Sequence, residues 1–208
     1  MPEVSARPRR GRPGHDQQAV LRVAIDLFIR QGYDATSMGD LAAELGLSKA
    51  ALYHHVPGKE RLLELALDEA LGGLTALVAR ATDDGAEGTA YARLRQVVED
   101  GVRLLVAHQP AVTLLLRVHG NTEVERAALE RRRWVDARLA ALVREAAAEG
   151  AVRDDLAPDV VSRLLFGMVN SLVEWYDAAG PVDPGELARA VAAVAFEGLV
   201  SPPAGRAR

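Results

Sequence analysis

The chain has 208 residues and a net charge of −4, and it contains no cysteine. This length allows a sizeable hydrophobic core, and the ordinary share of apolar residues indicates a soluble globular protein. The absence of cysteine excludes disulfides and thiolate metal sites, and no apolar run is long enough to cross a membrane. The basic N-terminus lacks the apolar segment of a secretory signal, so we expect a cytoplasmic protein.

The charge is distributed unevenly along the chain. Residues 1–61 carry a net charge of +2 and residues 62–208 a net charge of −6. Residues 1–14 combine four arginines with proline and glycine and show no apolar periodicity, so we expect a disordered basic arm. Arg10 and Arg12 lie in an Arg-Gly-Arg-Pro sequence that is similar to an AT-hook, which enters the minor groove of A·T-rich DNA. An ordinary solubilising tail explains the same residues equally well.

The rest of the chain is predicted to be all-α, because no stretch alternates with period two and apolar residues recur at helical spacing. Three helices are expected first, over residues 16–32, 37–45 and 48–56. Ser37 and Asp40 have the spacing of a capping box, and Gly46 is placed to end the second helix. Six further helices are expected, over about residues 58–80, 89–107, 110–118, 122–149, 158–179 and 184–199.

The second and third helices are short and joined by the tight turn Gly46-Leu47-Ser48, which is the pattern of a helix-turn-helix. Such a motif places the second helix in the major groove of DNA. Serines at the helix starts suit phosphates, and a lysine can reach a guanine edge or a phosphate. Tyrosine and histidine side chains can donate hydrogen bonds to phosphates, and alanine is short enough to allow close approach to the groove. The candidate DNA contacts are Ser37, Ser48, Lys49, Ala50, Tyr53, His54, His55 and Lys59. A plain helical turn with solvated polar residues is the alternative interpretation.

The ordered sequence LFIRQGYDATSMGDLAAELGLSKAALYHHVPGKERLL decides between these interpretations. It closely resembles the DNA-binding domain of the TetR family of transcriptional regulators. The resemblance implies a DNA-binding domain over residues 15–61 and a ligand-binding and dimerisation domain over residues 62–208. It also implies a homodimer that represses at a palindromic operator and is released by a small-molecule effector.

The last two predicted helices are candidates for the dimer surface. The helix that starts at Pro158 is apolar on nearly all sides, so more than one side must be covered. The final helix is rich in alanine, which permits close approach of another helix. Two such helices from each subunit would form a four-helix interface with two-fold symmetry. An intramolecular core would use the same residues.

Polar and aromatic residues within apolar runs are the candidates for effector binding. Arg117 follows three leucines, and Trp134, Asn170 and Trp175 lie in the later helices. The C-terminal half resembles TetR members that respond to acyl-CoA thioesters, which implies phosphate binding by the arginine run that begins at Arg131. The alternatives are a snorkelling Arg117, ordinary core packing for the other three residues, and solvated ion pairs for the arginine run.

An all-helical enzyme or an adaptor that does not bind DNA is the competing class of function. The sequence contains no His-Glu-x-x-His motif, no glycine-rich phosphate loop and no Gly-x-Ser-x-Gly elbow. An adaptor would explain the later helices but not the cluster of Ser48, Lys49, Tyr53 and Lys59. We therefore expect a regulator without catalytic residues, metal or cofactor, whose partners are double-stranded DNA and a small molecule.

Overall fold

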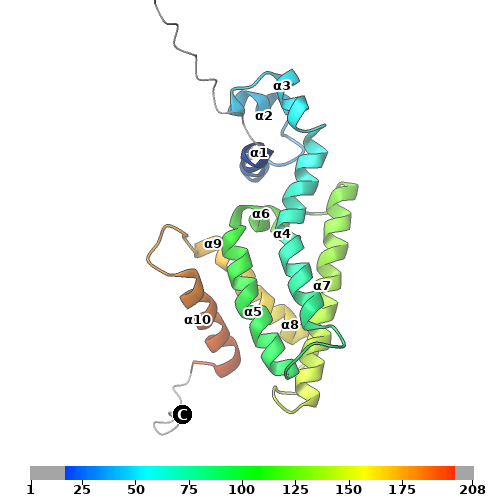
Figure 1. Cartoon of the computed structure of the whole chain (residues 1–208), viewed down its shortest axis with the longest axis vertical. Helices are drawn as coiled ribbons and strands as arrows, with labels where there is room; N and C mark the ends of the chain where they lie inside the picture. The colour runs from blue at the N-terminus through cyan, green and yellow to red at the C-terminus, as the bar shows by residue number, and fades with distance from the viewer. Residues whose placement is uncertain (1–16, 200–208) are drawn as a thin grey trace, which may run out of the picture. The chain divides into compact units, whose positions relative to one another are not determined.

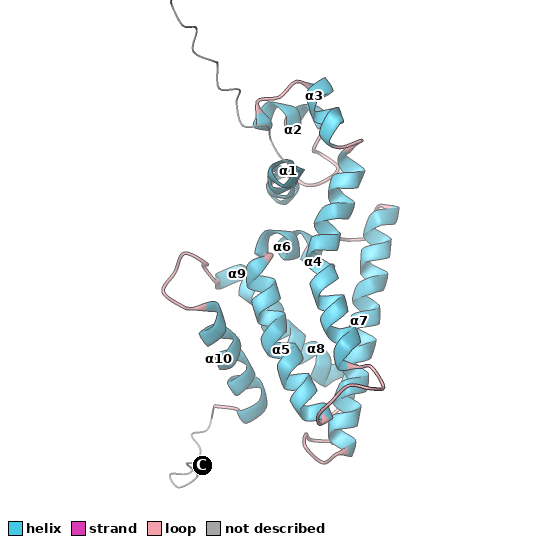
Figure 2. Ribbon diagram, in the orientation of Figure 1, coloured by secondary structure: helices cyan, strands magenta, loops and turns pink. Residues whose placement is uncertain are grey.

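The structure is a computed structural model, and it describes residues 17–199 (Figure 1). The elements of this part of the chain are helices, and no strand occurs in it (Figure 2), which confirms the all-α prediction. The predicted basic arm, including Arg10 and Arg12, lies outside the described residues.

Ten helical segments follow one another between residues 17 and 199. Their bounds are α1 Gln17–Gln31, α2 Met38–Leu45, α3 Lys49–His55, α4 Lys59–Ala81, α5 Ala90–Ala107, α6 Gln109–Leu116, α7 Glu123–Ala148, α8 Pro158–Asn170, α9 Leu172–Trp175 and α10 Pro184–Glu197. The chain forms two compact units that divide between Leu63 and Glu64, within the first turns of α4.

The predicted signals at the ends of α2 are present in the structure. The Ser37 hydroxyl oxygen accepts hydrogen bonds from the backbone N–H groups of Gly39 and Asp40, and the Asp40 carboxylate accepts from the Ser37 backbone N–H. This is the reciprocal capping box that the sequence predicts. Gly46 ends the helix with φ of 64°, a left-handed conformation that glycine adopts without steric cost.

The apolar faces of α1, α2 and α3 form the core of the first unit. Each helix contributes side chains at helical spacing, and the chain that follows α3 adds another. The buried set includes Val20, Ala24, Leu27, Phe28, Leu41, Leu45, Leu52 and Val56. This packing holds α3 by the side that carries Leu52, and the helix exposes all of its other residues except the half-buried Ala51.

In the second unit, α5 packs against α7, α8 and α10 (Figure 1). Leu94, Val98, Val102 and Leu105 recur along α5 and are buried. They join the core formed with the buried faces of α7, α8 and α10. Tyr91 adds an edge-to-face contact with Phe196 of α10, with ring centroids 5.5 Å apart.

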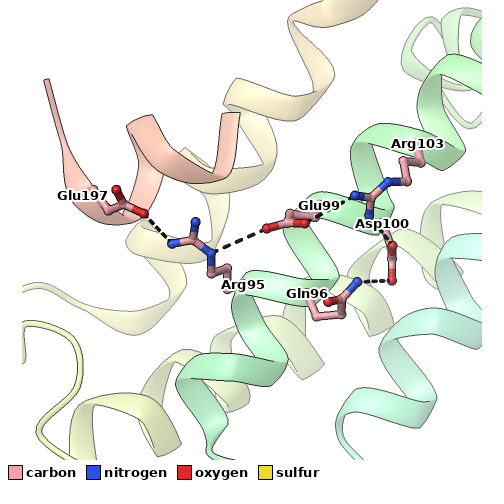
Figure 3. Close-up of polar contacts among 6 residues, drawn as sticks. All are labelled: Arg95, Gln96, Glu99, Asp100, Arg103 and Glu197. Atoms are coloured by element: carbon pink, nitrogen blue, oxygen red, sulfur yellow. Dashed lines mark hydrogen bonds and ion pairs between the residues drawn. The ribbon is translucent and has the colours of Figure 1, made fainter. Parts of the chain in front are cut away.

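Polar side chains on α5 also hold the end of α10 (Figure 3). The Arg95 guanidinium lies 2.8 Å from the Glu197 carboxylate and 3.5 Å from that of Glu99 on its own helix. Glu99 in turn accepts from Arg103, which also pairs with Asp100. The hydrogen bond with Glu197 raises the pKa of Arg95 above its ordinary value.

The prediction of one continuous helix over residues 158–179 is wrong. The helix is interrupted at Ser171 and divided into α8 and the short α9, which ends at Trp175. Tyr176 then takes an extended backbone and is buried, with its hydroxyl donating to the Val182 carbonyl oxygen at 3.0 Å. The side chain of Gln109 donates to the Tyr176 carbonyl oxygen at 3.0 Å. Both contacts hold Tyr176 outside the helix, and the one with Gln109 joins residues 67 positions apart in the chain.

Candidate DNA-binding helix and effector cavity

Helix α3 exposes most of its polar side chains. Ser48 caps the helix, because its hydroxyl oxygen accepts from the Ala51 backbone N–H at 3.1 Å. Leu52 is completely buried, whereas 52% of the Tyr53 surface is exposed. The residues that face solvent on this helix are Lys49, Ala50, Tyr53, His54 and His55. The structure thus brings five of the predicted DNA contacts onto one short helix held by its apolar side.

The side chain of Lys49 lies across the start of α2. A Cβ atom at Gly39 would lie 2.9 Å from Lys49 Cε and 3.2 Å from its Nζ, so the absence of a side chain at Gly39 gives Lys49 room. Hydrogen bonds from Ser37 lower the pKa of the nearby Asp40, and the positive charge of Lys49 adds to this effect. Ser37, Asp40 and Lys49 therefore form one polar cluster at the start of α2.

Lys59 has a structural environment that the sequence did not predict. Its ammonium donates to the carbonyl oxygens of Tyr33 and Thr36 at 3.0 Å each, and to that of Asp34 at 3.4 Å. It also lies 4.4 Å from the centre of the Tyr33 ring. An ammonium has three N–H donors, so these three acceptors use all of them. The predicted phosphate contact of Lys59 would require that at least one of these bonds break.

The second unit contains a small apolar cavity of about 60 Å³ between α4, α5, α6, α7 and α8. Its apolar wall includes Leu71, Leu105 and Phe166. Its polar groups are the side chains of Arg132 and Asp136 from α7 and of Asn170 from α8. A concave apolar site with a few polar groups is the usual form of a small-molecule site.

One of the five predicted effector residues, Asn170, lines this cavity. Arg131 instead pairs with Asp68, and Trp134 lies beside Arg138, whose guanidinium carbon is 5.5 Å from the ring centre. Trp175 is 61% exposed. Effector contacts by Arg131, Trp134 and Trp175 at this cavity are therefore not favoured.

Arg117 does not line the cavity either. It is exposed and ends α6, where its backbone N–H bonds to the carbonyl oxygens of Leu114 and Leu115. Arg132, which does line the cavity, belongs to the arginine run that the sequence analysis proposed for phosphate binding, whereas Asp136 is the polar lining residue that it missed. Arg132, Val135 and Asp136 are spaced as i, i+3 and i+4, which places them on one face of the helix. This spacing was the available signal that the two polar residues lie together beside an apolar side chain.

Metal-binding clusters and membrane-spanning helices are absent from the described part of the chain. No three histidine, aspartate or glutamate side chains gather there in an arrangement that would hold a metal ion. None of its helices has the length and apolar character needed to cross a membrane.

A helical head with a capped, exposed third helix and a larger helical unit with an apolar cavity define the architecture of a ligand-responsive DNA-binding protein. Residues 20–66 match the family described as bacterial regulatory proteins of the tetR family, and residues 87–199 match the tetracyclin repressor-like C-terminal domain. The chain therefore belongs to the TetR family of transcriptional regulators, as the sequence predicted.

Individual relatives agree with this assignment. The transcriptional repressor KstR2 of Mycolicibacterium smegmatis is 24% identical over 193 residues, which cover 90% of this chain and 92% of that protein. The TetR regulator SCO3833 from Streptomyces coelicolor is 48% identical with a TM-score of 0.80, covering 88% of this chain and 91% of that one. AibR, solved in complex with isovaleryl coenzyme A and operator DNA, is 25% identical with a TM-score of 0.69, covering 86% and 97%.

Proposed function

We propose that the protein is a homodimeric repressor that binds a palindromic operator through α3 and is released by a small-molecule effector. The exposed face of α3 carries this proposal, because it offers a cation and three hydrogen-bonding side chains on a helix anchored by the buried Leu52. In a major groove, Lys49 and Tyr53 would reach base edges or phosphates.

The other proposed DNA contacts surround this pair. Ala50 permits close approach, His54 and His55 donate to phosphates, and Ser37 and Ser48 lie at the starts of α2 and α3. Arg10 and Arg12 of the basic arm are proposed to add minor-groove or phosphate contacts. The charge supplied by these residues predicts binding that weakens steeply as salt is raised.

The dimer is proposed to form through α8 and α10. On α8, Val160 and Leu164 are spaced by four and are 45% and 63% exposed. Val194 of α10 is also exposed, at 42%. Exposed apolar side chains at helical spacing favour burial against a second copy. Two copies supply the two α3 helices that a palindromic operator needs.

The effector is proposed to occupy the cavity of the second unit. A coenzyme A thioester fits this proposal, because its acyl group is apolar and its phosphates suit Arg132 and Arg133, the two arginines of the run that are not paired with Asp68. The relative AibR, whose structure holds isovaleryl coenzyme A, supports the same class. Ala70, Leu71 and Leu74 of α4 line the cavity, while the same helix begins at Lys59 in the first unit. A shift of α4 would then couple effector binding to DNA binding, provided that the effector binds the DNA-binding conformation and the released conformation with different affinities.

The competing proposals, an enzyme or an adaptor, lack a comparable observation. We propose that the chain has no catalytic role and acts in the cytoplasm, where DNA and metabolites are both available. Family membership as a transcriptional regulator supports this assignment.

A gel-shift assay at low salt with DNA that flanks the gene tests the proposal. We expect a shift with the wild-type protein and none with the double variant Lys49→Ala, Tyr53→Ala. Arg144→Ala, an exposed residue of α7, is the matched control for loss of a positive charge and should bind like wild type. Equal binding by the double variant and wild type would exclude α3 as the recognition helix.

A further inference from the structure

Gly101 lies inside α5 and lines the effector cavity. Glycine in the middle of a helix lowers its stability relative to alanine, so a helical glycine needs a structural or functional reason. Close packing does not supply that reason here. A Cβ atom at Gly101 would meet only two atoms of the Phe166 ring, each at 3.9 Å, which is an ordinary contact distance.

A side chain at residue 101 would instead take space from the cavity. The cavity volume of about 60 Å³ has room for roughly four to six non-hydrogen atoms, since one water needs about 10–15 Å³ by the same measure. A methyl group removes a substantial part of such a small volume. Gly101 therefore maintains cavity volume at the expense of helix stability.

The polar groups of the cavity indicate what the rest of the effector looks like. No hydrogen bond or ion pair within residues 17–199 engages the side chains of Arg132 or Asn170. Arg131, the neighbour of Arg132, is by contrast paired with Asp68. The guanidinium of Arg132, the carboxylate of Asp136 and the amide of Asn170 suit an effector with an apolar end and a polar part that both accepts and donates hydrogen bonds.

We propose that Gly101 sets the size limit of the effector, whose short apolar end of about four to six atoms lies against Gly101 and Phe166 while its polar part faces Arg132 and Asn170. This inference rests on the proposed function, because it assumes that the effector enters this cavity. It adds the size of the apolar group and the residue that selects for it.

The test compares Gly101→Ala with Gly72→Ala. Gly72 is also inside a helix, α4, where an added Cβ atom would meet no neighbouring atom within 4 Å, and it does not line the cavity. Both variants should melt at a higher temperature than wild type, because alanine is the better helix former. A folded Gly101→Ala protein thereby separates cavity filling from misfolding.

Calorimetric titration with acetyl-, isovaleryl- and palmitoyl-coenzyme A measures the selectivity. We expect isovaleryl-coenzyme A to bind wild type and Gly72→Ala alike, and to bind Gly101→Ala roughly tenfold or more weakly, while acetyl-coenzyme A is little affected. Palmitoyl-coenzyme A should bind wild type poorly because its chain exceeds the cavity. Equal affinity of isovaleryl-coenzyme A for wild type and Gly101→Ala would overturn the inference.

Crystals of each protein under xenon pressure give a measurement that needs no knowledge of the effector, since apolar cavities bind xenon. We expect xenon beside Gly101 in wild type and Gly72→Ala, and none in Gly101→Ala. The same occupancy in all three proteins, or none in wild type, overturns the inference. If xenon follows this pattern but no thioester binds, the size limit holds and the coenzyme A assignment is wrong. Failure of wild type to shift operator DNA would refute the proposed function separately.

Discussion

The ammonium of Lys59, which begins α4, lies 3.0 Å from the carbonyl oxygen of Tyr33, which begins the turn after α1. The same ammonium bonds Thr36, so one side chain holds the segment that leads into α2. The half-buried Lys59 thus holds the segment between α1 and α2 against the start of α4.

Replacement of Lys59 by methionine is expected to destabilise the protein without removing a DNA contact. Loss of charged hydrogen bonds to carbonyl groups should lower the free energy of unfolding by about 1–3 kcal/mol. The slope of log affinity for operator DNA against log salt should stay the same, because a Lys59 that contacts no phosphate releases no counterion. Urea unfolding and salt-dependent operator binding measure the two effects.

Lys49→Ala provides the comparison for that experiment. This variant removes an exposed cation of α3. If the lysine binds a phosphate, the magnitude of the slope of log affinity against log salt should be smaller than that of wild type by about 0.9. A similar reduction in the slope of Lys59→Met would show that Lys59 contacts phosphate directly, as the sequence analysis expected.

Titration of Asp40 is expected to reveal the capping box. Hydrogen bonds from Ser37, with the charge of Lys49, keep the pKa of Asp40 below its ordinary value of 3.8 in the folded protein. Because the folded-state pKa is lowered, the charged carboxylate stabilises the fold above pH 3.8, and this contribution is lost as the pH falls through the lowered pKa. Carboxyl NMR titration of wild type and Ser37→Ala tests this, and the variant should show a pKa closer to 3.8. An Asp40 pKa at or above 3.8 in wild type would contradict the structure.

Leu164→Glu is expected to weaken the dimer. The side chain is 63% exposed on α8, and a carboxylate there cannot be buried against a second copy without a partner. Analytical ultracentrifugation should show a wild-type dimer and a larger monomer fraction for the variant, with unchanged helix content. Ala137→Glu places the same charge on an exposed position of α7 and should remain dimeric. A variant that dimerises as tightly as wild type would place the interface elsewhere.

Arg93→Met is expected to lower the stability of the second unit by about 2 kcal/mol. Its guanidinium donates to the carbonyl oxygen of Ala81 at 2.6 Å and to the Glu145 carboxylate at 2.9 Å, so it joins the end of α4 to α7. Methionine keeps the apolar stem but makes neither bond. Thermal melts detect the loss, and Arg144→Met, which replaces an exposed arginine of α7, should melt like wild type. Equal melting of both variants would mean that the bridge contributes little.

The sequence predicted local features of this protein well because they depend on neighbouring residues. The capping box needs Ser37 and Asp40 three residues apart, and the end of α2 needs a glycine at residue 46. The ordered motif from Leu27 to Leu63 identified the family, and α3 exposes the polar residues that the helical spacing indicated.

Only the tertiary structure could decide features that join distant parts of the chain. The end of α9 at Trp175 accompanies the hydrogen bond from Gln109 to the Tyr176 carbonyl oxygen, 67 residues away in the chain, which no local apolar pattern records. The carbonyl groups that surround Lys59 lie 23 to 26 residues away in the chain, so its environment could not be read from its neighbours. The cavity likewise depends on five helices, and their packing places Arg132 at it and Arg131 beside Asp68. Helix caps and apolar spacing act over a few residues, whereas packing decides which face of a helix lines a cavity. For this reason the sequence alone determined the family and the exposed third helix, but not the residues that line the cavity.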